Sequence, residues 1–229
     1  MADIEFETKK EKIKKVYEKL TKVLQTEEIV LVGGSAMLLT ADHERKLNDL
    51  DVAVPPKALV GVPDTLAHEM GFEMFMDGPK LMTLTDTETG LEAEVSAKNC
   101  GNLNAKLGLP KYTEEKPTIL GLDLWKVIRD SVIVDEIRTP SPFHQVLMKY
   151  NLWRFRGDGK ISGQKDAEDI KKLLAFYYKG SLSMFYNSFN DRDLVNSNVD
   201  AKQFKLDMEL ISGIASERDM AGQMENNKA

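Results

Sequence analysis

Apolar residues recur at helical spacing near the start of the chain. Between residues 8 and 25 they alternate with lysines and glutamates at Ile13, Val16, Tyr17, Leu20, Val23 and Leu24. A single apolar stripe of this period is typical of an amphipathic helix whose other face meets solvent. We therefore expect residues 8–25 to form a helix that packs on the next elements.

A short apolar run follows and ends in two glycines. Residues 29–32 are branched or aliphatic, and Gly33-Gly34-Ser35 comes directly after them. This order predicts a buried strand that closes into a turn, with Ser35 capping a helix over residues 36–39. The helix is expected to end before the charged loop at residues 42–48.

Three further segments have the alternation of strands. In residues 49–54 the first four side chains alternate between acidic and apolar, and Pro55-Pro56 stops the strand. Leu81–Thr85 and Leu91–Ala97 also have period-two patterning, and the polar stretch between them predicts a hairpin. A short helix is predicted from Pro63 to Met70, with Asp64 as its cap.

The chain becomes helical after a proline-rich boundary at residues 139–142. Before it, residues 110–117 read as a loop and 132–134 as a strand. After it, helices are predicted over 143–155 and from about 166 to 178, with Gly157-Asp158-Gly159 stopping the first. Residues 181–229 look helical but polar, with a frayed end.

This order of elements indicates an α/β (α+β) protein. We expect a small mixed β-sheet core flanked by helices, including the N-terminal helix, over residues 1–138. A helical C-terminal region is expected over residues 139–229.

Composition narrows the classes of function. Among 229 residues, 42% are hydrophobic and the formal net charge is −6, so the chain as a whole has no general attraction for nucleic acid. Cys100 has no partner for an internal disulfide, and the cysteine and three histidines lack metal-site spacing. With no signal-like start and no apolar run of about 18 residues, the expected location is cytoplasmic, with the nucleus left open.

Candidate chemistry lies in two acidic pairs and the glycine turn. Asp49 and Asp51 share one face of a predicted strand, as do Glu92 and Glu94 on a later one. Adjacent strands can bring three of these carboxylates together, and their repulsion favours a bound cation such as Mg²⁺. Backbone at Gly33-Gly34 can approach phosphate closely, and Ser35 can offer a hydroxyl.

These residues resemble the signature of the DNA polymerase beta-type nucleotidyltransferase superfamily. Val32-Gly33-Gly34-Ser35 is followed, after residues 36–48, by Asp49-Leu50-Asp51-Val52. The chain is most similar to the minimal subgroup of abortive-infection toxins and aminoglycoside-modifying enzymes, several of which have Arg or Lys before the acids, as Arg45 and Lys46 are here. A second block also resembles this subgroup; its residues are Thr139-Pro140, Phe143, Leu147, Lys149, Arg154, Arg156, Lys165-Asp166 and Asp169-Ile170.

The resemblance implies transfer of a nucleoside monophosphate from a nucleoside triphosphate (NTP) to a hydroxyl acceptor. Asp49, Asp51 and Glu94 would bind Mg²⁺, with Mn²⁺ as a substitute and Glu92 as the alternative third acid. Glu94 would also accept the proton of the attacking hydroxyl. The NTP would be held by Gly33, Gly34, Ser35, Arg45, Lys46 and Lys149.

Several plainer interpretations stay open at this level. Glu92 and Glu94 also fit the solvated face of a hairpin, and Lys149 fits a surface lysine on an amphipathic helix. Asp166 and Asp169 also fit the charged first turn of a helix. The acceptor is a protein, a small molecule or an RNA end, with the acidic composition favouring the first two. The alternative function is a nucleotide-binding or interaction module of the same fold without turnover.

Overall fold

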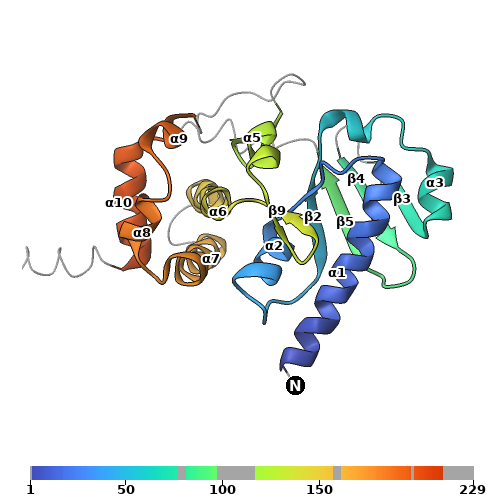
Figure 1. Cartoon of the computed structure of the whole chain (residues 1–229), viewed down its shortest axis with the longest axis horizontal. Helices are drawn as coiled ribbons and strands as arrows, with labels where there is room; N and C mark the ends of the chain where they lie inside the picture. The colour runs from blue at the N-terminus through green and yellow to red at the C-terminus, as the bar shows by residue number, and fades with distance from the viewer. Residues whose placement is uncertain (1, 77–80, 97–116, 157–160, 197–198, 214–229) are drawn as a thin grey trace, which may run out of the picture.

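The protein folds as a mixed α/β structure, which confirms the predicted fold class. The computed structural model describes residues 2–76, 81–96, 117–156, 161–196 and 199–213. In Figure 1 the sheet lies on the right with helix α1 (Ala2–Leu24) across it, and the last three helices, α8 (Leu182–Tyr186), α9 (Asp191–Asn196) and α10 (Ala201–Ser212), lie on the left. Helices α6 (Pro142–Arg156) and α7 (Ile161–Tyr178), viewed nearly end-on, lie between the sheet and these three helices.

Five strands form one mixed sheet in the order β1-β2-β5-β4-β3. Its strands are β1 (Val30–Val32), β2 (Asp49–Ala53), β3 (Phe72–Met76), β4 (Leu81–Asp86) and β5 (Glu92–Ser96). Strands β2 and β5 are parallel, and the other neighbouring pairs are antiparallel. The predicted β4–β5 hairpin is confirmed, whereas β3 was not predicted.

One face of the sheet is apolar and packs against α1 (Ala2–Leu24). From β2, Leu50 and Val52 join this buried cluster, and from β5, Ala93 and Val95 do so. The acidic residues between them must then lie on the opposite face, because side chains alternate along a strand. Helix α1 thus fixes which face of the sheet carries the carboxylates.

The remaining elements lie between the first three strands of the sheet or after its last strand in the chain. Short elements come first: α2 (Gly33–Thr40), the 3₁₀ turn η1 (Pro56–Leu59), α3 (Asp64–Glu69), β6 (Thr118–Ile119), β7 (Leu122–Asp123), α5 (Leu124–Arg129), β8 (Val132–Val134) and β9 (Ile137–Thr139). The C-terminal helices are α6 (Pro142–Arg156), α7 (Ile161–Tyr178), α8 (Leu182–Tyr186), α9 (Asp191–Asn196) and α10 (Ala201–Ser212). Strands β6 and β7 pair with each other, as do β8 and β9, and these two small ribbons lie outside the main sheet.

A second hydrophobic cluster joins the two predicted regions. It contains Val30 and Val32 of β1 together with Val146 and Tyr150 of α6 and residues of α7, α8 and α10. The predicted boundary between residues 138 and 139 falls inside β9. The helical region therefore packs on the sheet core through continuous apolar contacts.

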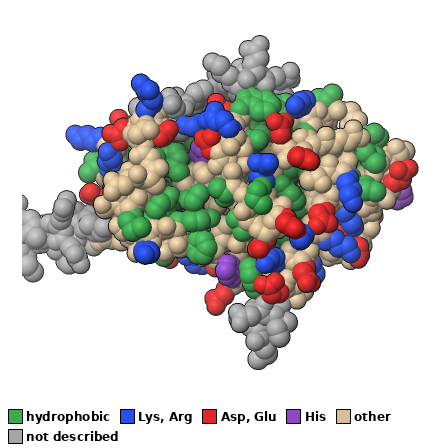
Figure 2. Space-filling view, viewed as in Figure 1, with side chains coloured by type: hydrophobic (Ala, Val, Ile, Leu, Met, Phe, Trp, Pro, Cys, Tyr) green, Lys and Arg blue, Asp and Glu red, His purple; other side chains and the backbone are tan. Residues whose placement is uncertain are grey.

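Ion pairs at the surface attach α1 to the β8–β9 turn. Lys10 Nζ lies 3.0 Å from Asp135 Oδ2, and Lys14 pairs with Glu136. Figure 2 shows acidic and basic side chains close together over this part of the molecule. Exposed pairs of this kind contribute little to stability, so the apolar cluster beneath α1 holds it in place.

Two predicted helix caps are wrong. Helix α2 begins at Gly33, and the Ser35 hydroxyl donates to the carbonyl of Val32 at 3.0 Å instead of capping the helix. Helix α3 has Pro63 at its N-cap, so Asp64 is already helical and makes no capping hydrogen bond. The extended backbone of Pro63, with φ of −72°, matches the φ that the proline ring fixes.

The helices of the C-terminal region start earlier than expected. Helix α7 begins at Ile161, so Asp166 and Asp169 lie beyond its first turn. The predicted loop at 110–116, the stop at 157–159 and the tail from 214 lie outside the described residues. In the described part of the chain, no helix combines the length and apolar character needed to cross a membrane.

Candidate functional site

The turn between β1 and α2 passes directly beside Asp51. Gly33 has a φ of +63°, and a Cβ at this position would lie 1.9 Å from Asp51 Oδ2. The next backbone N–H, of Gly34, faces the same carboxylate oxygen, with 3.4 Å between N and Oδ2. Only glycine fits at residue 33, because both the left-handed backbone and the carboxylate exclude a side chain.

The four candidate acids lie in register on the two parallel strands. Asp49 is paired with Glu92, and Asp51 is paired with Glu94. Neighbouring strands are about 4.8 Å apart, so each pair consists of close neighbours on one face. The strand register thus places Asp49 beside Glu92 and Asp51 beside Glu94 on neighbouring strands.

A pocket of about 970 Å³ opens on this face of the sheet. Asp49, Asp51 and Glu94 line it together with the glycine turn, whereas Glu92 is not among the described lining residues. The structure therefore distinguishes the two glutamates by position. Glu94 is the one that shares a cavity with the aspartates.

The carboxylates in this pocket destabilise one another's charged forms. Burial, followed by the charge of Asp49, raises the pKa of Asp51, although the Gly34 N–H, Lys149 and Arg45 act in the opposite direction. Burial and the charges of Asp51 and Asp49 also raise the pKa of Glu94. None of the three acids forms an ion pair with a described cation.

This donor set matches a hard divalent cation in chemistry. All three side chains offer carboxylate oxygens, the ligands that Mg²⁺ prefers. As they stand, the described residues contain no group of three or more His, Cys, Asp or Glu side chains gathered as a metal site. Asp49, Asp51 and Glu94 are thus adjacent in register and share a pocket, but their side chains do not converge on one point.

Two predicted phosphate ligands that also line the pocket are held by Asp169 of α7. Arg45 Nη1 lies 2.8 Å from Asp169 Oδ1, and Lys149 Nζ lies 2.6 Å from Asp169 Oδ2. The Asp169 side chain is only 3% exposed. Burial alone would raise the pKa of Asp169, but the Arg45 hydrogen bond and the Lys149 charge lower it.

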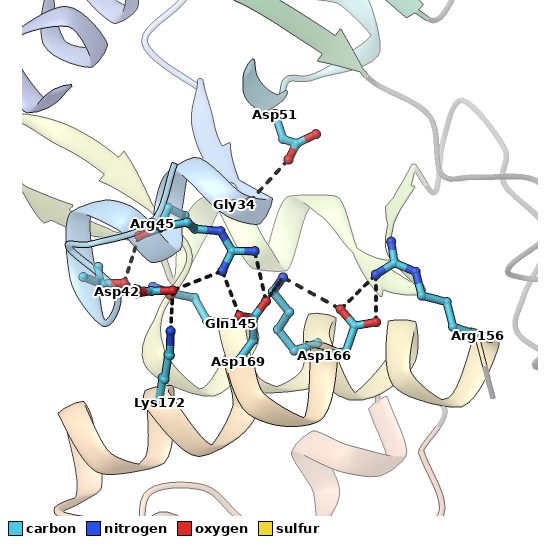
Figure 3. A network of polar contacts seen from close by, with 12 residues as sticks. Gly34, Asp42, Arg45, Asp51, Gln145, Arg156, Asp166, Asp169 and Lys172 are labelled. Carbon is cyan, nitrogen blue, oxygen red and sulfur yellow. Dashed lines mark hydrogen bonds and ion pairs between the residues drawn. The ribbon is translucent and has the colours of Figure 1, made fainter. Parts of the chain in front are cut away.

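The ion-pair network extends along α7 in both directions (Figure 3). Asp166, which is fully buried, accepts two hydrogen bonds from Arg156 Nη1 and lies 3.9 Å from Lys149 Nζ. Near the other end, Lys172 pairs with Asp42 at 2.7 Å. Because Arg45 and Asp42 belong to the loop before β2, the network links that loop to α6 and α7.

Other predicted nucleotide ligands have separate positions. Ser35 lines the pocket, but it is 3% exposed and its hydroxyl already donates to Val32. Lys46 is exposed at the pocket and forms no ion pair with any described acid. Lys149 is buried, so the interpretation as a surface lysine is wrong.

The roles of Asp166 and Asp169 were missed from the sequence. Both were interpreted as possible charges on a first helical turn, but they are buried partners of three cations. The available signal was their i, i+3 spacing, which places both on one face of a helix. Arg45, the partner of Asp169, is 124 residues away from it in the chain. Local sequence patterns cannot show a contact over such a separation.

Comparison with known proteins assigns neither a family nor a function to the chain. No protein-family model matches the chain, and no curated protein does. The crystal structure of JHP933 from Helicobacter pylori is similar over 94% of this chain and 95% of that chain, with a TM-score of 0.40 and 14% sequence identity. A likeness this distant does not bear on function.

Proposed function

We propose that the chain is a metal-dependent nucleotidyltransferase that transfers a nucleoside monophosphate from an NTP to a hydroxyl acceptor. One observation carries the proposal. Asp51 lies beside a glycine turn and is paired with Glu94 on the neighbouring strand, and Asp49, Asp51, Glu94 and the turn all line one pocket. We also propose that the chain belongs to the polymerase beta-type superfamily, within its abortive-infection toxin subgroup.

Asp49 and Asp51 are the residues that would hold Mg²⁺, with Glu94 as third ligand. When bound, the ion supplies positive charge that offsets the carboxylates and the triphosphate, and it polarises the α-phosphate. The pocket volume of about 970 Å³ lies at the upper end of the range for small-molecule sites, which leaves room for an acceptor group beside an NTP.

The chain's own residues have separate tasks in the transfer. The Gly33-Gly34 backbone lets phosphate oxygens approach the start of α2 closely. Arg45 and Lys149 line the same pocket and supply positive charge, held in place by Asp169. Glu94 takes the proton as the acceptor oxygen bonds to the α-phosphorus and the bond to the bridging oxygen breaks, releasing pyrophosphate.

The second candidate is a nucleotide-binding module without turnover. It is favoured by one observation: Arg45 and Lys149 are already paired with Asp169. Cations that are partly neutralised in this way bind phosphate less strongly than free ones.

Transfer of label from an α-³²P-labelled NTP separates the two functions. We expect label to enter the protein itself or one class of molecule in a cell extract, only with Mg²⁺ or Mn²⁺. Asp51→Asn should abolish the transfer, whereas Asp135→Asn, in the exposed β8–β9 turn, should leave it unchanged. Metal-dependent NTP binding by calorimetry, with no transfer to any acceptor, would contradict turnover and support the binding module.

A further inference from the structure

The pocket continues past the acids along one face of α6. Lys149, Leu152 and Arg156 all line it, and their spacing of three and four residues places them on the same face of the helix. Leu152 therefore lies between two cations. Ile119 of β6 and Leu120 of the β6–β7 turn also line the pocket, so this part has apolar side chains from two elements.

The β6–β7 turn has a backbone that does not suit its sequence. Ile119 pairs with Leu122, which leaves Leu120 and Gly121 as a two-residue turn. Their φ angles are +48° and +82°, and positive φ at both positions normally selects Asn, Asp or Gly. Leucine is a rare choice at such a position, and its half-buried side chain lines the pocket.

A buried amide holds this turn. Asn151 of α6 is 0% exposed, and its Nδ2 donates to the carbonyl of Leu120 at 2.8 Å. Its Oδ1 has no hydrogen-bond partner among the described residues. Burying an asparagine whose oxygen is unsatisfied costs free energy. Among the described residues, the hydrogen bond to Leu120 is the interaction that offsets this cost.

We propose that Leu120, with Ile119 and Leu152, forms the surface on which the nucleoside part of the NTP packs, and that Asn151 is the residue that positions this surface. The inference rests on the proposed function. With the triphosphate between the glycine turn and Lys149, the base and sugar need an uncharged surface beyond the acids. The aliphatic side chains of Leu120 and Leu152 supply such a surface within the same pocket, and strain at Leu120 is retained because its side chain is needed there.

The test compares two ligands that share phosphates and differ in the nucleoside. The four Mg–NTPs are titrated separately by calorimetry, and the tightest is compared with Mg–tripolyphosphate. Leu120→Asn keeps a residue that accepts positive φ but removes the apolar side chain. We expect it to weaken NTP binding about tenfold, as loss of one buried aliphatic contact predicts, and to leave tripolyphosphate binding unchanged.

Asp135→Asn is the matched control, because Asp135 has a φ of +49° in the β8–β9 turn and does not line the pocket. It should change neither affinity, whereas Asp51→Asn should weaken both. Equal NTP affinity in Leu120→Asn and wild type, or an equal loss for both ligands, would overturn the nucleoside surface while leaving the phosphate site intact. If wild type binds neither ligand, the proposed function itself fails, and this inference with it.

The positioning role of Asn151 has its own readout. Asn151→Ala should weaken NTP binding without changing tripolyphosphate binding, and it should add no further loss in the Leu120→Asn background. This non-additivity arises because the amide acts through the Leu120 side chain. Additive losses, or a loss for both ligands, would show that Asn151 serves only general packing and would overturn its role.

Discussion

Gly33 and Asp51 form a contact that leaves no room for a side chain. A Cβ at Gly33 would lie 1.9 Å from the Asp51 carboxylate, and φ is +63°. Gly61 offers a matched comparison, because its φ is +76° and a Cβ there would meet nothing within 4 Å. Substituting each glycine by alanine therefore separates backbone strain from the contact with Asp51.

We expect Gly61→Ala to lower the free energy of unfolding by about 1 kcal/mol through backbone strain alone, with NTP binding unchanged. Gly33→Ala should cost more and should also abolish metal-dependent NTP binding, because Asp51 must move. Urea denaturation and calorimetry measure the two effects. Normal NTP binding by Gly33→Ala would contradict the role given to the Asp51 contact.

Asp51 is also a residue where function opposes stability. Burial and Asp49 raise the pKa of Asp51 above its unfolded value, so its ionised form is penalised in the folded state. The penalty is present above the raised pKa and disappears as the pH falls through the unfolded value of about 3.9.

Asp51→Asn should therefore raise the melting temperature of the metal-free protein at pH 7. The gain should shrink as the pH falls toward the unfolded pKa of about 4, because protonation of Asp51 removes the penalised charge. Mg²⁺ should raise the melting temperature of wild type but not of the variant, because a ligand stabilises only the protein that binds it. A less stable variant in EDTA at pH 7 would contradict the assigned repulsion.

At the scale of elements, α7 carries the charges that hold one wall of the pocket. Asp169 joins Arg45 of the loop before β2 to Lys149 of α6, and all three side chains are largely buried. Removal of one partner of a buried ion pair leaves uncompensated charge in the interior. The adjacent Glu168 makes an exposed pair with Lys171 and provides the control.

Asp169→Asn should lower the free energy of unfolding at pH 7 by about 3 kcal/mol or more. Glu168→Gln should cost at most about 1 kcal/mol. Because the pKa of Asp169 is lowered in the fold, its contribution is present above the unfolded pKa and is lost as the pH falls through the folded one. Equal costs for both variants in urea denaturation at pH 7 would refute the buried network.

Local sequence patterns predicted the elements that pack against a single neighbouring layer, because that layer sets the spacing of their apolar residues. The alternation in β2 and β5 identified both faces of the strands, because apolar positions face α1 and acids face the pocket. Helix α1 and the β4–β5 hairpin were predicted for the same reason. Edge strand β3 was missed, since its residues 73–76 are exposed or half-buried and show no alternation.

The rest of the site depends on contacts between distant segments. The pairing of Asp51 with Glu94 follows from a parallel register that the sequence does not encode locally. The same holds for Asp169 with Arg45, and for Asn151 with the strained turn at Leu120. Asp169 and Asn151 are buried polar groups whose hydrogen-bond partners only the tertiary fold supplies, whereas Asp51 and Glu94 are like charges that the fold brings together.

At the scale of the whole molecule, the sheet core and the helical region enclose the pocket between them. The apolar cluster that joins β1 to α6, α7 and α8 fixes their relative position. The acids of the sheet, the glycine turn and cations of α6 and α7 therefore line one pocket. We therefore expect a divalent cation to bridge the acids and a triphosphate in this pocket, which is the central claim.

The most direct test is a crystal structure of the protein with Mn²⁺ and a non-hydrolysable NTP, with anomalous scattering locating the metal. We predict an anomalous peak between the carboxylates of Asp49 and Asp51, in contact with phosphate oxygens near Gly33 and Gly34. A nucleotide bound with no metal at these carboxylates, or a metal and nucleotide located outside this pocket, would contradict the claim.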